Sequence, residues 1–110
     1  MVQIYTIDSF DREFKRLAKK YASLSADLGQ LIKQLQENPT LGTSLGNNAF
    51  KIRIAISSKN KGKSGGARVI TYFITEENEL FLLSIYDKSE RADIPDKLLQ
   101  GLIAQAIDAK

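Results

Sequence analysis

The sequence predicts a single α+β domain, and three observations support this prediction. The chain has 110 residues, a length typical of one domain with one hydrophobic core. Residues 2–7, 50–56, 67–75 and 79–86 have the pattern of strands. Two segments after the first strand and one after the last have helical spacing. Consecutive strands with short links favour an antiparallel sheet, and two successive helices can cover one of its faces. We therefore expect the order β-α-α-β-β-β-α in one domain over residues 1–110.

The first half of the chain predicts a strand and then a pair of helices. Residues 2–7 have the alternation of a short strand, and Asp8 or Ser9 can cap the helix that follows, because a side-chain oxygen there accepts a backbone N–H. The second helix must end before Pro39, since the proline ring disfavours helical backbone at the preceding residue. The link between the helices is short, so they should form an antiparallel hairpin. Its core-facing stripes are Phe10, Phe14, Leu17, Ala18 and Tyr21, then Leu24, Leu28, Leu31, Ile32 and Leu35.

The middle of the chain predicts a loop, a strand and a second loop. Residues 40–48 contain glycines and asparagines and indicate a loop. Residues 50–56 alternate cleanly, so their apolar side chains should face the helices while Lys51 and Arg53 lie together on the opposite face. Residues 58–66, SKNKGKSGG, have no apolar side chain, and we expect a mobile basic loop there.

The second half of the chain predicts a hairpin of strands and a last helix. Residues 67–75 and 79–86 have strand composition and are separated by a short polar link, which favours antiparallel pairing. After a turn over residues 87–93, Pro95 is suited to the first turn of a helix, because its fixed φ matches the helical value. The apolar side of this helix contains Leu98, Leu99, Leu102, Ile103 and Ile107.

The positive charge of the chain is concentrated in one stretch. The net charge is +3, but no acidic residue occurs between residues 51 and 68. The remainder carries 10 basic and 13 acidic residues, a balance of −3, so the positive field is local. A local basic patch on a near-neutral body is what a phosphate backbone attracts. The six basic residues of this stretch are Lys51, Arg53, Lys59, Lys61, Lys63 and Arg68.

The missing residue types restrict the chemistry. The chain has no cysteine and no histidine, which excludes disulfides, thiolate metal sites, the usual zinc ligand and the usual general base. We expect neither a metal nor another cofactor. No apolar run approaches the roughly 18 residues of a membrane-spanning helix, and the first residues lack the pattern of a secretory signal. The expected location is the cytoplasm.

The predicted sheet brings a group of cations and a tyrosine together. Arginine and lysine bind phosphate, tyrosine can stack on an unpaired base, and fixed cations stabilise the charge of a cleaved phosphodiester. RNA supplies its own nucleophile, the 2′-hydroxyl. A like-charged cluster disfavours the ammonium form of lysine, so Lys51, or less readily Glu90, can take the 2′-proton. Each feature alone is more typical of a solvated strand face or a flexible connector. The residues expected to converge are Lys51, Arg53 and Arg68, then Tyr86, Lys88 and Glu90.

Three segments closely resemble HigB-like toxins of the RelE/ParE superfamily: KIR at 51–53, KGKSGGARVI at 61–70 and LLSIYDKSE at 82–90. The resemblance extends over nearly the whole chain in element order. It implies a RelE-like fold and the toxin of a type II toxin–antitoxin system. Such a toxin cleaves mRNA in the ribosomal A site, where 16S rRNA helps to hold the substrate. A cognate antitoxin inhibits it and also binds operator DNA, which represses their shared promoter.

The resemblance also implies roles for individual residues. Lys51 and Arg53 match a basic pair proposed for proton abstraction and charge stabilisation. Arg68 matches an arginine that contacts the scissile phosphate, and Lys88 a basic residue that acts on the phosphate or the leaving group. The residues expected to bind RNA or the ribosome are Lys59, Lys61, Lys63, Tyr86 and Glu90.

Two points leave alternatives open. Several relatives have a functional tyrosine or histidine near the C-terminus, whereas this chain has no tyrosine after Tyr86 and no histidine. The general acid is then Lys88 or Tyr86, or cleavage depends more on electrostatics and the ribosome. The competing functions are a ParE-like gyrase inhibitor, a superfamily member that binds RNA or an antitoxin without cutting, and an unrelated basic binding module.

Overall fold

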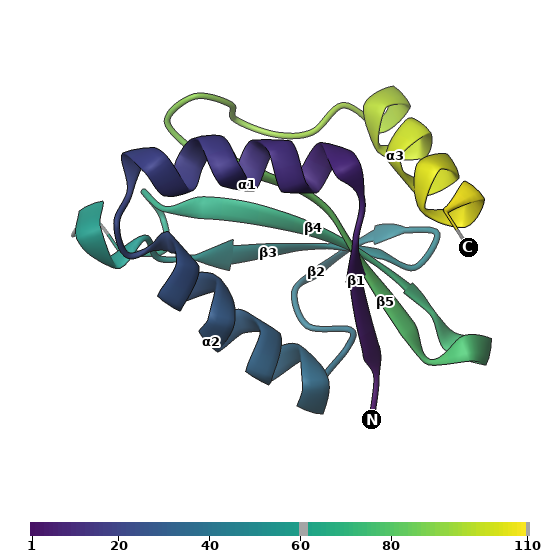
Figure 1. Cartoon of the computed structure of the whole chain (residues 1–110). Helices are drawn as coiled ribbons and strands as arrows, with labels where there is room; N and C mark the ends of the chain where they lie inside the picture. Colours follow the sequence, from purple (N-terminus) through teal and green to yellow (C-terminus); the bar gives the residue numbers. More distant parts are fainter. Residues whose placement is uncertain (60–61, 110) are drawn as a thin grey trace.

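The computed structural model describes residues 1–59 and 62–109, and it has the predicted α+β architecture (Figure 1). Within these residues, no helix is long and apolar enough to cross a membrane. The elements are β1 (Gln3–Thr6), α1 (Asp8–Lys20), α2 (Leu24–Glu37), β2 (Thr43–Gly46), β3 (Ala49–Ile54), β4 (Ala67–Ile74), β5 (Glu79–Asp87) and α3 (Asp96–Asp108), with short 3-10 turns at Ser57–Lys59 and Thr75–Glu77.

The strands form one mixed sheet in the order β1-β5-β4-β3-β2. Neighbouring strands from β2 to β5 are antiparallel, as predicted, but β1 lies parallel to β5. The prediction of an antiparallel sheet is therefore confirmed for β2 to β5, and the pairing of β1 departs from it. Two strands can be parallel only when a long connection carries the chain back to the same end, and here the helices and three other strands form that connection. The pairing partner of β1 is thus decided by the whole fold.

The segment over residues 40–48 is not all loop, because it contains β2. This strand pairs antiparallel with β3, with Thr43 opposite Lys51. The two strands are joined at Asn47 and Asn48, whose φ angles are 52° and 63°. Positive φ at both central residues is typical of a tight hairpin turn, and asparagine adopts it more easily than most residues. The asparagine pair was the one local signal for this hairpin.

The two N-terminal helices cover one face of the sheet. Figure 1 shows α2 returning from the end of α1 at an angle, so the pair is the expected hairpin with its helices splayed. The buried side chains of β3, Ile52 and Ile54, face it, together with their cross-strand neighbours Val69 and Ala67. On the opposite face, fully buried Ile70 indicates a second layer, formed by residues 88–95 and α3.

The start of α1 differs from the expected cap. Its N-cap is Ile7, which has no capping side chain, and Asp8 is already helical. A carboxylate in the first turn is still favourable there, because it interacts with the positive end of the helix dipole. The hydroxyl of Ser9 instead donates to the Leu83 carbonyl at 3.3 Å, which ties α1 to β5. Helix α1 is thus positioned by the sheet.

One glycine of the KGKSGGARVI segment is required by packing. A Cβ on Gly66 would lie almost on the Ile54 carbonyl oxygen of β3. We expect Gly66→Ala to lower the free energy of unfolding by at least about 2 kcal/mol, because the clash involves backbone that cannot move aside. Gly101→Ala is the matched control: its Cβ meets open space on α3, and alanine should stabilise the helix by roughly 0.5–1 kcal/mol. Urea unfolding of both variants measures the difference, and equal midpoints would contradict the packing argument.

Candidate functional site

The basic residues of β3 and β4 converge as the alternation predicted. Strand register places Arg53 opposite Arg68, and Arg68 opposite Tyr86. Lys51 lies two residues before Arg53, on the same side of β3. These four side chains form the group that we call the basic face: Lys51, Arg53, Arg68 and Tyr86.

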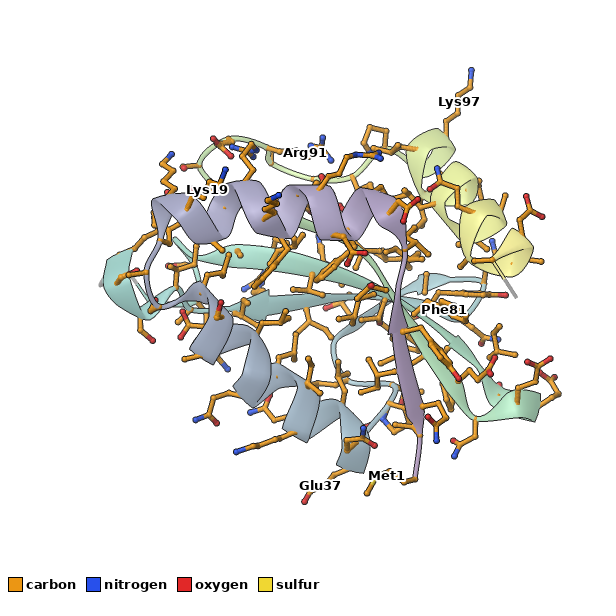
Figure 2. All side chains as sticks on the ribbon, in the orientation of Figure 1. Met1, Lys19, Glu37, Phe81, Arg91 and Lys97 are labelled. Carbon is orange, nitrogen blue, oxygen red and sulfur yellow. The ribbon has the colours of Figure 1, made fainter. Side chains whose placement is uncertain are left out.

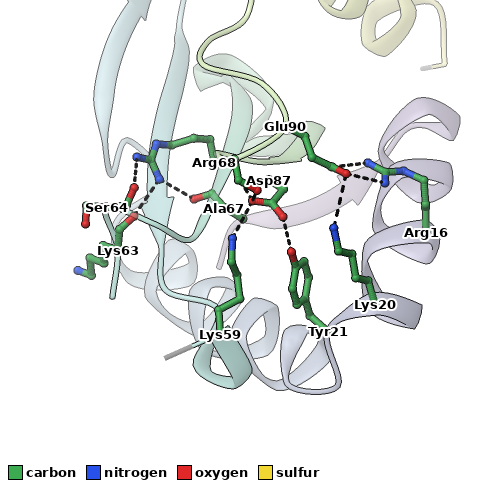
Figure 3. A network of polar contacts seen from close by, with 11 residues as sticks. Arg16, Lys20, Tyr21, Lys59, Lys63, Ser64, Ala67, Arg68, Asp87 and Glu90 are labelled. Carbon is green, nitrogen blue, oxygen red and sulfur yellow. Dashed lines mark hydrogen bonds and ion pairs between the residues drawn. The ribbon is translucent and has the colours of Figure 1, made fainter. Parts of the chain in front are cut away.

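Arg68 is at the centre of the basic face and is only 5% exposed. Its Nη1 donates to the carbonyl oxygens of Lys63 and Ala67 at 2.9 and 3.2 Å, and its Nη2 donates to that of Ser64 at 3.4 Å (Figure 3). All three acceptors are neutral, so the guanidinium is held in place without losing its positive charge. A fixed cation of this kind suits a phosphate whose charge grows during reaction.

Tyr86 is buried with an unsatisfied hydroxyl. The residue is 3% exposed, and its Oη has no hydrogen-bond partner among the described residues. Burial raises the pKa of Tyr86, and the nearby Asp93 carboxylate raises it further. The Arg91 guanidinium lies 5.4 Å from the ring centroid. A buried hydroxyl left unpaired costs about 1–3 kcal/mol, so a water or a bound ligand that donates to or accepts from Tyr86 Oη would be stabilised there.

Residues 88–95, which we call the covering segment, lie over the basic face. The Lys51 ammonium forms an ion pair with Asp93 at 3.3 Å. The backbone N–H of Ile94 holds the pKa of Asp93 below its usual value, and Lys51 adds to this effect. The Lys88 ammonium donates to the Ala92 carbonyl of the same segment at 3.0 Å. Lys51, Tyr86 and Lys88 are therefore all engaged or covered in this conformation.

The cations between β3 and β4 do not form one uniform mobile loop. The Lys59 ammonium donates to Asp87 at 2.9 Å, and the two side chains are 10% and 0% exposed. Lys59 is thus half-buried with its ammonium paired, which contradicts the expectation of a free cation in a mobile loop. Lys63 is exposed and its side chain has no partner in the described part of the chain. Lys61 lies outside the described residues.

The buried carboxylate of Asp87 is a feature that the sequence analysis did not identify. It accepts hydrogen bonds from the Tyr21 hydroxyl at 2.5 Å, from Lys59, and from the N–H and hydroxyl of Ser89 (Figure 3). Burial alone would raise the pKa of Asp87, but these hydrogen bonds outweigh it and hold that pKa well below its usual value. The cluster joins α1, the turn after β3 and the end of β5. A single acidic residue that ends an apolar strand was the only local signal.

Glu90 is not part of the basic face. It accepts hydrogen bonds from both terminal nitrogens of Arg16, at 2.9 and 3.3 Å, and lies 3.8 Å from the Lys20 ammonium. Figure 3 shows it turned toward α1, on the other side of Asp87 from Arg68. The hydrogen bond from Arg16 lowers the pKa of Glu90. A carboxylate paired in this way, on the far side of Asp87 from Arg68, does not fit the role of alternative base.

The chemistry of the site therefore depends on lysine, arginine and tyrosine. Over residues 1–59 and 62–109, no group of three or more acidic side chains comes together in a way that could hold a metal ion. Phosphate binding and proton transfer by the basic face are the reactions that its residue types allow.

Comparison with known proteins agrees with this fold. A family model described as the RelE toxin of the RelE/RelB toxin–antitoxin system matches residues 9–109. The chain is similar to a solved mutant of the Escherichia coli toxin RelE in the free state, with 14% identity, 98% of this chain and 96% of that chain covered, and a TM-score of 0.60. A metal-bound toxin from Helicobacter pylori is a more distant likeness, with 20% identity, 82% of this chain and 98% of that chain covered, and a TM-score of 0.46. The match to the family model over nearly the whole sequence shows that this chain belongs to the RelE toxin family, whose members act as toxins of toxin–antitoxin systems with an antitoxin as partner.

Proposed function

We propose that this chain cleaves mRNA in the A site of the translating ribosome and so inhibits translation. The observation that supports this most directly is the row formed by Arg53, Arg68 and Tyr86 across β3, β4 and β5. It combines two cations with a tyrosine, as binding of a phosphate and an unpaired base requires. The proposed partners are the ribosome with its 16S rRNA, mRNA, a cognate antitoxin and, through the antitoxin, operator DNA. The proposed location is the cytoplasm.

The proposed reaction uses the 2′-hydroxyl of the RNA as nucleophile. Lys51, once deprotonated, takes the 2′-proton, and the 2′-oxygen attacks the adjacent phosphorus while the bond to the 5′-oxygen breaks. Arg53 and Arg68 stabilise the additional charge on the phosphate oxygens. Lys88 or Tyr86 donates a proton to the leaving 5′-oxygen. The products are a 2′,3′-cyclic phosphate and a free 5′-hydroxyl.

The covering segment must move before this reaction can begin. Lys51 can accept a proton only after it leaves Asp93, and Tyr86 can reach a base only when Arg91 and its neighbours no longer cover it. The Lys51–Asp93 pair is partly in solvent, with side chains 23% and 65% exposed, so its loss costs little free energy. We propose that binding in the A site provides the competing contacts.

Primer extension on a defined mRNA, with and without translating ribosomes, tests the proposed function. We expect cuts only when ribosomes are present, within codons that occupy the A site. Cuts in free RNA would contradict the ribosome dependence. Absence of cuts in both conditions, together with inhibition of purified DNA gyrase, would instead identify a ParE-like inhibitor. Absence of both activities would leave a family member that binds without cutting.

The salt dependence of ribosome binding tests the role of the basic loop. Each phosphate contact contributes about 0.7 to the slope of log affinity against log salt for single-stranded nucleic acid. We expect Lys63→Gln to reduce the slope by about this amount, because its ammonium is free. Lys97→Gln is the matched control, since Figure 2 shows Lys97 projecting from α3 away from the sheet. If Lys63→Gln leaves the slope unchanged, residue 63 makes no phosphate contact.

A further inference from the structure

A groove runs between α2 and the outer edge of β3. Strand β2 pairs with β3 only as far as Lys51, so the rest of this edge is not covered by a strand. A hollow of about 750 Å³ opens here, and a smaller one of about 150 Å³ continues it toward the end of β3. Both hollows are lined by Gln34, Arg53 and Lys63, so we treat them as one edge groove.

The helical wall of the edge groove presents amide side chains. Gln30 and Gln34 line it and are four residues apart, which places them on one face of α2. Asn38, the residue after the helix, also lines it, and its Oδ1 accepts hydrogen bonds from Thr40. Gln30 and Gln34 are exposed, and neither side chain forms a hydrogen bond within the described part of the chain. An amide has both donors and an acceptor, as the edge of an unpaired base does.

The opposite wall of the edge groove is positively charged. Arg53 and Lys63 are exposed, and their side chains have no partner among residues 1–59 and 62–109. A guanidinium plane can stack on a base and a lysine can pair with a phosphate. The groove contains Glu37 and Asp27 as its acids, and Asp27 is already engaged by the backbone N–H and hydroxyl of Ser57. The free charge that faces a ligand is therefore mainly positive.

The floor and size of the edge groove suit one nucleotide. Leu41 and Ile52 contribute apolar surface between the two polar walls. A volume of about 750 Å³ is within the usual range for small-molecule sites. A peptide added as a strand would instead require apolar pockets for alternate side chains, whereas the two walls of this groove present amides and cations. The lining thus favours RNA over a peptide.

The edge groove continues directly from the basic face. Arg53 belongs to both, and its neighbour Arg68 is one strand away, a backbone spacing of about 5 Å. An RNA strand whose phosphate reaches Arg68 therefore passes Arg53 at the mouth of the groove. We propose that the edge groove binds an unpaired nucleotide of the mRNA next to the cleaved phosphodiester and reads its base through Gln34. This inference rests on the proposed cleavage of mRNA.

The test combines cut-site mapping with photo-crosslinking on translating ribosomes. The variant is Gln34→Leu, which removes the hydrogen-bonding groups of an exposed side chain and leaves an apolar one that is one atom shorter. Gln105→Leu on α3 is the matched control, because Gln105 is exposed and does not line the edge groove. The mRNA library varies the nucleotides on either side of the cut, and a second set contains 4-thiouridine at those positions.

We expect Gln34→Leu to reduce discrimination at one flanking nucleotide by about three- to tenfold, the effect of one lost hydrogen bond. Gln105→Leu should retain the wild-type pattern and extent of cutting. Crosslinked 4-thiouridine should map to the tryptic peptide over residues 34–51, which contains most of the lining of the larger hollow.

Other outcomes would overturn the inference in distinguishable ways. Cutting with an unchanged pattern in Gln34→Leu, and crosslinks only to other parts of the sheet, would remove the edge groove from the RNA path while the proposed function stands. Weaker antitoxin binding by Gln34→Leu, with no effect on RNA, would make the groove a protein-binding site. Absence of cuts and of crosslinks in the wild-type protein would contradict both the inference and the proposed function.

Discussion

Arg68→Ala is expected to lower ribosome-dependent mRNA cleavage by about 10²–10³-fold, the loss typical of one fixed donor that stabilises transition-state charge. The guanidinium is buried at the centre of the basic face, and the carbonyls of Lys63 and Ser64 hold it there. Water can satisfy these carbonyls in the variant, because both residues are exposed. The fold should therefore persist while cleavage is lost. Circular dichroism measures the first and primer extension the second.

Arg68→Lys separates charge from geometry at this position, and Arg12→Ala is a surface control. Arg68→Lys retains a positive charge but replaces the planar five-donor guanidinium, which binds three carbonyls, by three donors on one nitrogen, so we expect a partial loss of cleavage. Arg12→Ala removes an exposed arginine of α1 and should leave cleavage unchanged. Growth arrest by Arg68→Ala equal to that of the wild type would refute the role assigned to Arg68.

Asp87→Asn is expected to lower the free energy of unfolding by about 3–5 kcal/mol, because it leaves the buried Lys59 ammonium without its counter-charge. The carboxylate is fully buried and accepts hydrogen bonds from Tyr21, Lys59 and Ser89. Thermal unfolding of the variant measures the loss. The double variant Lys59→Met/Asp87→Asn should lose less free energy of unfolding than the two single variants added together, since both charges of the pair are then removed.

The surface pair of Arg16 and Glu90 is the matched control for this prediction. Its side chains are 58% and 37% exposed, so solvent screens their interaction. Glu90→Gln should change the free energy of unfolding by less than about 1 kcal/mol. A loss in Asp87→Asn no larger than in Glu90→Gln would show that the buried cluster does not stabilise the fold.

The stability of the protein should also depend on pH through Asp87. The hydrogen bonds to this carboxylate hold its pKa in the folded state well below the unfolded value of about 3.9. Below that unfolded value the unfolded chain binds a proton that the folded protein does not, so the free energy of unfolding falls as the pH decreases from about 5. Asp87→Asn should show a shallower decrease, which urea unfolding between about pH 5 and pH 2 measures.

Most elements of the fold could be predicted because their signals are local. Helical spacing and strand alternation identified three helices and four of the strands, and Asn38 before Pro39 marked the end of α2. Strand β2 was missed because it is a four-residue edge strand whose order comes from pairing with β3. The parallel pairing of β1 with β5 was missed because it joins residues 76 positions apart, such as Gln3 and Glu79.

The local arrangement of the candidate site could also be predicted, because it depends on strand alternation. Alternation with a period of two placed Lys51, Arg53 and Arg68 on one face, because successive side chains of a strand point to opposite sides. The sequence by itself thus determined the fold class, most of the elements and which cations share a face. Their catalytic roles remain a proposal.

Only the tertiary structure decided which of those cations are free. Asp93 pairs with Lys51, Asp87 pairs with Lys59, and backbone carbonyls hold Arg68, whereas Arg53 remains exposed beside the edge groove. The two ion pairs join parts of the chain that are 42 and 28 residues apart and meet only in the folded protein. Periodicity determines the direction of a side chain along its own strand, but the partner that meets it there is supplied by the rest of the fold.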